Sequence, residues 1–150
     1  MLDVPRAISL YERAWSEGVS IAAFQLGQLY ENGVQRGGTE AGYLLPPDKT
    51  RAWLWYRKAA DAGQPNALAR LAERDHVAAF FASSPGNKRL HSLQSFRYYA
   101  AAAERARLED WPEEAWRGWR YRRASLARML AGEGMTQEVA DVYDGIRSHH

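Results

Sequence analysis

The chain contains no cysteine, which excludes disulfide bridges, zinc–thiolate sites and cysteine nucleophiles. It also lacks any apolar run near the roughly 20 residues that span a bilayer. The N-terminus shows no basic segment followed by an apolar one, so no secretory signal is visible. A chain without cysteine suits an oxidising or a reducing compartment equally. The sequence therefore leaves localisation open between cytoplasm and periplasm.

An excess of charge of one sign is missing too, since 20 basic and 18 acidic residues give a net charge of +2. A dedicated nucleic-acid binder carries a stronger basic footprint. Lysine is scarce, with three residues against 17 arginines. Arginine forms bidentate pairs with carboxylates and stacks on aromatic rings, although genomic base composition produces the same bias. With 150 residues and 46% hydrophobic content, the composition indicates one folded domain or a short array of repeats.

The sequence repeats itself at a shift of 45 residues. The shift pairs Tyr11 with Tyr56 and Gly18 with Gly63, and it also pairs Asp3, Ala7, Ala14, Ala22 and Leu26 with Asp48, Ala52, Ala59, Ala67 and Leu71. A further shift of 43 pairs Tyr56 with Tyr99 and Ala59 with Ala102. The matches recur at steps of three and four residues, which is helical spacing. The pattern predicts repeated helical units.

Capping residues, prolines and glycines predict about seven helices. We expect them over residues 3–18, 20–33, 48–63, 65–83, 92–108, 110–134 and 136–147. Ser20 is the expected cap of the second helix, and Ser92 the expected start of the fifth. Residues 34–47 are expected to form a long loop, and 84–87 a turn. No stretch alternates like a half-buried strand, so the predicted fold is all-α.

Gly27 lies inside a predicted helix, where glycine costs about 1 kcal/mol relative to alanine. We expect it where a neighbouring helix approaches closely. Alternating small and large side chains elsewhere indicate stacked helical hairpins around a continuous core. The large side chains that fill the space between successive pairs are interpreted as core residues, namely Tyr11, Trp15, Tyr30, Trp53, Trp55 and Tyr56.

Two segments resemble the Sel1-like repeat, a relative of the tetratricopeptide repeat. Residues 20–33 match the first helix of that repeat, with its alanines, Leu-Gly pair, tyrosine and terminal glycine. Residues 48–63 match the second helix, with its Asp, Trp-Tyr, Lys-Ala-Ala and glycine. Residues 3–18 look like another second helix, so the chain is expected to begin in the middle of a unit.

The resemblance implies a single domain over residues 1–150, a short α-α superhelix of stacked antiparallel helix pairs. Clear repeats cover residues 3–72, and residues 73–147 are degenerate or capping. The expected loop at 34–47 is about nine residues longer than usual in the family. It is either an irregularity of the array or a specific binding element.

Signatures of enzymes are absent from the sequence. His76 and His91 lie fifteen residues apart without carboxylates at ligand spacing, so no metal site is expected. The serines at 83, 84 and 92 lack a histidine and carboxylate arrangement, and Gly37-Gly38 lacks the Lys-Ser/Thr of a phosphate loop. We expect a non-catalytic protein without a cofactor.

The family resemblance implies a scaffold or adaptor that binds a partner protein on the concave face of the solenoid. Bacterial members act in secretion, envelope assembly and toxin immunity. The first helix of each pair lines that face. The expected partner-binding residues are Gln25, Gln28, Glu31, Arg70, Glu73, Arg74, Trp116, Arg120 and Arg123. Solvated helix faces would show the same residues.

One segment supports an alternative function. Residues 116–123 interleave arginines with Trp116, Trp119 and Tyr121, a combination that stacks on single-stranded bases and neutralises phosphates. The same face could pack into the core and leave its arginines to pair with glutamates. We therefore expect a protein partner rather than nucleic acid. Exchanging Arg120 and Arg123 for glutamate is expected to weaken binding without unfolding the domain.

Overall fold

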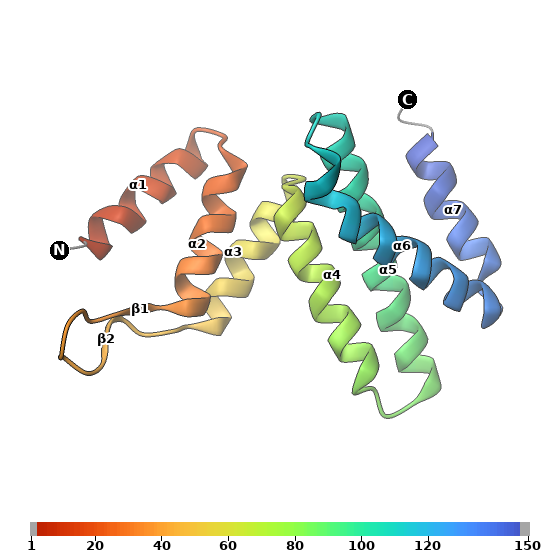
Figure 1. Cartoon of the computed structure of the whole chain (residues 1–150), viewed down its shortest axis with the longest axis horizontal. Coiled ribbons are helices and arrows are strands. Elements are labelled where there is room, and N and C mark those ends of the chain that lie inside the picture. Colours follow the sequence, from red (N-terminus) through yellow and green to blue (C-terminus); the bar gives the residue numbers. More distant parts are fainter. Residues whose placement is uncertain (1–2, 148–150) are drawn as a thin grey trace. The chain divides into compact units, whose positions relative to one another are not determined.

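A computed structural model describes residues 3–147 and shows an all-α protein (Figure 1). Seven helices fall within that range, as predicted. They are α1 (Val4–Ser16), α2 (Ser20–Asn32), α3 (Lys49–Asp61), α4 (Pro65–Phe80), α5 (Pro85–Leu108), α6 (Glu113–Gly132) and α7 (Thr136–Arg147). The chain divides into two compact units, of which unit 1 ends at Ala67 and unit 2 begins at Leu68.

The helices α1 and α3 begin and end in the same way. Asp3 accepts a hydrogen bond from the backbone N–H of Arg6 at 3.1 Å, and Asp48 accepts one from Arg51 at the same distance. These side chains satisfy N–H groups that a helix start leaves unpaired. Each helix is followed by a glycine with positive φ, 92° at Gly18 and 82° at Gly63. The 45-residue repeat of the sequence is thus a repeat of local structure.

The core of unit 1 forms where α2 packs against α3. Ala22, Ala23 and Leu26 of α2 are buried. Tyr56 of α3 is fully buried, and its ring lies 5.5 Å from that of Phe24, measured between centroids. A Cβ atom on Gly27 would overlap the Tyr56 ring, so the expected close approach at Gly27 is present. On its other side α2 contacts α1 (Figure 1).

The segment expected to be a long loop contains a short hairpin, which refines the prediction for residues 34–47. Strand β1 (Val34–Gln35) pairs antiparallel with β2 (Tyr43–Leu45), and Val34 lies opposite Leu45. Strands of two and three residues are too short for alternation to show in the sequence. Gly33 has a φ of 66°, and a Cβ there would clash with the carbonyl oxygen of Leu45. The hairpin leaves α2 through this turn.

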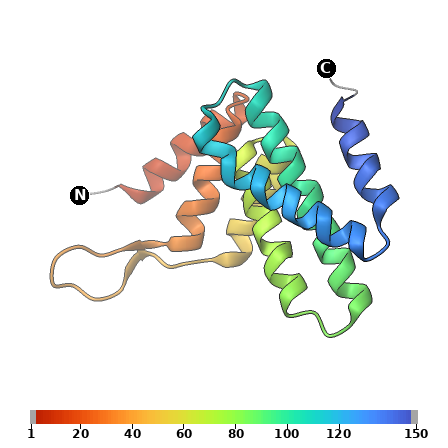
Figure 2. The same cartoon turned by 45° about the vertical axis from the view of Figure 1, so that its right-hand side comes forward.

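In unit 2 the long helix α5 carries the core. Leu93, Phe96 and Tyr99 pack with Leu126 and Leu130 of α6. The helix α7 lies along this layer (Figure 2) and contributes Tyr143, whose ring lies 5.8 Å from that of Phe96. The helix α5 also contacts α4, because the buried Ser95 hydroxyl of α5 donates to the carbonyl oxygen of Ala72 in α4 at 2.7 Å.

Three predicted helix boundaries are wrong. The helix α4 ends at Phe80 rather than Ser83, and α5 begins at Pro85 rather than Ser92. The side chain of Ser84 caps α5 by accepting from the N–H of Asn87 at 3.1 Å, and proline is tolerated at the first helical position. Ser20 is the first residue of α2 rather than its cap, which is Val19.

Candidate interaction surfaces

The three predicted residues on α2 have different surroundings. Gln25 and Gln28 are exposed on the surface of unit 1. Glu31 is half-buried, and its Oε1 atom accepts a hydrogen bond from the Tyr56 hydroxyl at 3.0 Å. Glu31 therefore joins α2 to α3, whereas the two glutamines are accessible to a partner.

The predicted residues of α4 lie in unit 2. Arg70 is half-buried and forms an ion pair with Glu73 at 3.0 Å, while Glu73 and Arg74 are exposed. Burial raises the pKa of the nearby Tyr99 hydroxyl, and the negative charge of Glu73 raises it further. Arg122 of α6 acts in the opposite direction. Charged side chains from α4 and α6 thus act on the same residue of α5.

The α6 residues are held by contacts within unit 2. Trp116 donates from Nε1 to the carbonyl oxygen of Trp111 at 3.2 Å. The guanidinium of Arg120 lies 5.6 Å from the centre of the Trp116 ring and 2.8 Å from a carboxylate oxygen of Glu113. Arg120 is still exposed. The Trp116 ring and the Glu113 carboxylate thus hold the Arg120 guanidinium in place at the surface.

Arg123 has a structural role in addition to the predicted one. It is half-buried, and its guanidinium lies 5.5 Å from the centre of the Tyr143 ring of α7. Its Nε atom is buried and has no hydrogen-bond partner within residues 3–147. Arg123 therefore contributes to the packing of α6 against α7, and its part in partner binding stays a prediction.

An exposed aromatic pair at the end of α4 was missed by the sequence interpretation. Phe80 and Phe81 are 80% and 77% exposed, and their rings meet edge to face at 5.1 Å between centroids. Val77, one turn earlier, and Leu90, on α5, are also exposed. The sequence predicts that the fourth helix continues to Ser83, which places both phenylalanines inside a helix. The sequence signal for an earlier helix end was the Ser-Ser-Pro segment that follows the two phenylalanines after one alanine.

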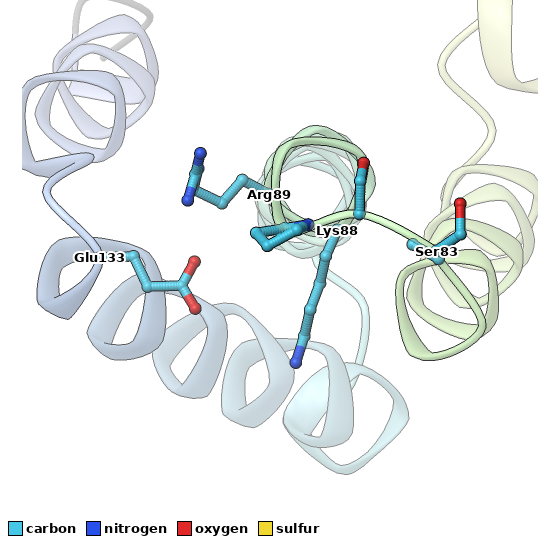
Figure 3. A pocket seen from close by; sticks show the side chains of 7 residues that line it. Ser83, Lys88, Arg89 and Glu133 are labelled. Atoms are coloured by element: carbon cyan, nitrogen blue, oxygen red, sulfur yellow. The ribbon is translucent and has the colours of Figure 1, made fainter.

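A pocket of about 350 Å³ opens at the turn between α4 and α5, which directly follows this pair in the chain. Its lining residues are Ala82, Ser83, Ser84, Pro85, Lys88, Arg89 and Glu133. Figure 3 shows Arg89 and Glu133 extending into the same space, from α5 and from the end of α6.

The nine predicted residues thus fall into both units, three in unit 1 and six in unit 2. Within unit 2, Glu73 acts on Tyr99 of α5, whereas Arg120 pairs with Glu113 and Arg123 lies against Tyr143 of α7. The single concave face implied by the family resemblance stays a prediction. The aromatic pair adds an accessible apolar surface that the prediction lacked.

The described residues also limit other chemistries. Within 3–147, no group of three or more His, Asp or Glu side chains is placed to hold a metal ion. His91 instead lies 3.3 Å from Asp75, between its Nδ1 atom and a carboxylate oxygen. None of the helices in this range is long and apolar enough to cross a membrane.

Comparison with known proteins gives no relative. No family model, no curated protein and no solved structure matches the chain.

Proposed function

We propose that the protein is a non-catalytic adaptor of the Sel1-like type that binds a partner protein through unit 2. The observation that carries the proposal is the exposed Phe80–Phe81 pair. Large aromatic side chains are enriched in the central parts of protein interfaces, where their burial supplies much of the binding energy. Phe80 and Phe81 together form an exposed apolar surface that a partner could bury.

The surroundings of the pair indicate the chemistry of the partner. Lys88 and Arg89 line the adjacent pocket, and only Glu133 opposes them there. Polar rims around apolar centres are the usual anatomy of a protein interface. The partner is therefore a protein that offers an apolar side chain or pocket bordered by acidic residues.

The local structure of unit 1 supports the repeat interpretation. The matching caps of α1 and α3 and the glycines that follow these helices occur at positions related by the repeat. Helical repeats bury a continuous core by stacking and leave extended surfaces for partners. The repeat of local structure supports a scaffold role, and the family resemblance points the same way.

The alternative of nucleic-acid binding has less support. The ring of Trp119 packs at 6.1 Å from that of Trp111, and Trp116 is covered by Arg120. Base stacking needs free ring faces. Tyr121, which is 66% exposed, offers one such ring. The positive charge of Arg120 beside it is paired with Glu113. These contacts favour a protein partner.

The test is capture of partners from nuclease-treated lysate of the source cells by the immobilised full chain. The variant F80S/F81S is compared with the wild type, and L54S serves as the matched control because Leu54 is exposed on α3 of unit 1. We expect one or more proteins to bind the wild type and L54S, and to be reduced at least tenfold with F80S/F81S. Circular dichroism verifies that all three chains are folded.

Two results would overturn the proposal. Equal capture by F80S/F81S would remove the aromatic pair from the interface. Salt-sensitive retention of nucleic acid by the untreated sample, lost in Y121A, would establish the alternative function instead.

A further inference from the structure

The junction between α2 and the hairpin is an Asn-Gly pair. The helix ends at Asn32, which is exposed, and Gly33 follows with a φ of 66°. A Cβ atom at Gly33 would lie 2.5 Å from the carbonyl oxygen of Leu45 and 2.8 Å from the backbone nitrogen of Pro47. Both neighbours are backbone atoms, so no rotation of a side chain would relieve the overlap. The turn therefore requires glycine directly after Asn32.

This pair can react within the chain, with water as the only co-reactant. The backbone nitrogen of Gly33 loses its proton to solvent and attacks Cγ of Asn32, because glycine has no Cβ atom to hinder the approach. The new C–N bond closes a five-membered succinimide, while the Cγ–Nδ2 bond breaks and Nδ2 takes up a proton and leaves as ammonia. Water then adds to one of the two ring carbonyl carbons, and the bond from that carbon to the Gly33 nitrogen breaks. The product is aspartate when water adds at Cγ, and isoaspartate when it adds at the backbone carbonyl carbon.

The folded chain opposes the first step of this reaction. The Gly33 N–H donates to the carbonyl oxygen of Leu29 at 2.9 Å, and this hydrogen bond holds the proton that the attack must release. Asn32 is helical, whereas closure of the ring requires its ψ to rotate away from the helical value of about −42°. Attack on Cγ therefore requires that the last turn of α2 opens.

That turn is tied to the start of the hairpin by two contacts. The backbone N–H of Asp48 donates to the carbonyl oxygen of Tyr30 at 2.7 Å, and Val34 pairs with Leu45. We call these two contacts the hairpin base. A protected group in a folded chain reacts through local opening of the contacts around it. Here the contacts that must open are those of the hairpin base.

We propose that Asn32 is a site of spontaneous deamidation whose rate is set by opening of the hairpin base. Either product weakens the junction. Aspartate places a negative charge at the C-terminal end of α2, which is already the negative end of the helix dipole. Isoaspartate routes the backbone through Cβ and Cγ, and the additional carbon atom moves the Gly33 N–H out of line with Leu29. The site lies in unit 1 and is separate from the aromatic pair of the proposed function.

The experiment incubates the full chain and a peptide of residues 29–36 with blocked ends in the same mildly alkaline buffer. Tandem mass spectrometry measures conversion at Asn32, and methyl transfer by isoaspartyl methyltransferase measures the isoaspartate fraction. We expect conversion in the folded chain to proceed, at least tenfold more slowly than in the peptide. Asn66 and Asn87, which precede alanine and lysine, are internal controls that are expected to stay unconverted while Asn32 reacts.

Variants of the hairpin test what sets the rate. V34G/L45G removes both side chains of the strand pair and is expected to speed conversion at least threefold, after division by the rate of a peptide that also carries Val34→Gly. Thr39→Gly introduces glycine at an exposed position away from the hairpin base and is expected to leave the rate unchanged. Circular dichroism verifies that both variants keep their helices.

Hydrogen exchange in the wild type follows the same opening without any substitution. We expect the slowing of exchange at the Gly33 N–H, relative to the peptide, to match the slowing of deamidation within about threefold. Conversion as fast in the chain as in the peptide would overturn the proposal, since the fold would then give no protection. An unconverted Asn32 after ten times the period in which the peptide reacts completely would show that the site is inert. Equal rates for V34G/L45G and Thr39→Gly, or a mismatch between exchange and deamidation, would separate the reaction from the hairpin base.

Discussion

The phenol ring of Tyr56 lies directly over Gly27, and the Tyr56 hydroxyl donates to Glu31 one helical turn further along the same helix. The side chain of Tyr56 thus makes two contacts with α2. Its ring packs where Gly27 has no side chain, and its hydroxyl donates to the carboxylate of Glu31. The lack of a Cβ at position 27 allows the two helices to approach closely. This relationship explains why a residue unfavourable to helices occurs in the middle of α2.

Substitution of Gly27 tests this relationship. In an open helix, Gly→Ala stabilises by up to about 1 kcal/mol. Here we expect Gly27→Ala to lower the free energy of unfolding by about 1–3 kcal/mol, because the added Cβ overlaps the buried ring. Urea denaturation monitored by circular dichroism measures the difference.

The matched control is Gly118→Ala, in the interior of α6. A Cβ at Gly118 would meet no atom within 4 Å in the described part of the chain. We expect this variant to be as stable as the wild type or slightly more so. A Gly27→Ala variant as stable as Gly118→Ala would contradict the close packing of α2 on α3.

Helix capping gives a second comparison, between Asp48 and Ser20. The carboxylate of Asp48 accepts from the N–H of Arg51, so Asp48→Ala is expected to cost about 1 kcal/mol. Ser20 is the first helical residue rather than the cap, so Ser20→Ala is expected to change stability by less than about 0.5 kcal/mol. Thermal unfolding of both variants distinguishes the two roles. Equal costs would restore the cap that the sequence suggested.

Arg123 and Arg120 are expected to respond differently to exchange for glutamate. Arg120→Glu removes an exposed ion pair, which contributes about 0–1 kcal/mol. Arg123→Glu places a carboxylate over the Tyr143 ring and is expected to cost about 1–3 kcal/mol. Arg123→Met is expected to stay within about 1 kcal/mol of the wild type, since it also removes the unpaired buried Nε atom. Urea denaturation of the three variants ranks them, and a destabilised Arg123→Met would show that the charge itself is required.

The stability of unit 2 should fall in alkaline solution because of Tyr99. Burial raises the pKa of this hydroxyl above its ordinary value of 10.0 in the folded chain. As the pH rises, the Tyr99 hydroxyl therefore loses its proton in the unfolded chain before it does so in the folded chain. Above pH 10 this ionisation stabilises the unfolded chain relative to the folded one. The contribution of Tyr99 is fully present below that pH and is lost as the pH rises through the folded-state pKa. Tyr99→Phe is expected to reduce the slope of unfolding free energy against pH above 10, and an unchanged slope would assign the effect to other groups.

The sequence predicted best where one residue has one dominant local effect. Asp3 and Asp48 mark helix starts because their side chains reach nearby N–H groups, and the glycines that follow α1 and α3 mark helix ends. It failed at Pro85 because glycine and asparagine right after a proline indicate a turn. There, the cap at Ser84 and the packing of α5 determined the structure instead.

The candidate sites were harder to predict, because exposure depends on tertiary packing. Val77 and Phe80 are three residues apart, a spacing that is typical of a core face, yet both are exposed although both lie within α4, and Phe81 directly after the helix is exposed as well. For Arg123 the difference between sequence and structure is the reverse, because the side chain is more buried than the sequence suggests. An arginine in a basic segment suggests solvent, but its position opposite α7 draws the aliphatic part of the side chain into the packed layer.

The hairpin in unit 1 offers a practical route for engineering. Its base is fixed by the pairing of Val34 with Leu45 and by the hydrogen bond from the N–H of Asp48 to the carbonyl oxygen of Tyr30, 2.7 Å long. Residues 35–44 between these ties are all exposed. Lengthening an exposed loop costs little, about 0.6 kcal/mol for each doubling. An epitope, a fluorophore site or a second binding module can therefore be grafted after Gly38, where it would report on partners without disturbing either helical core.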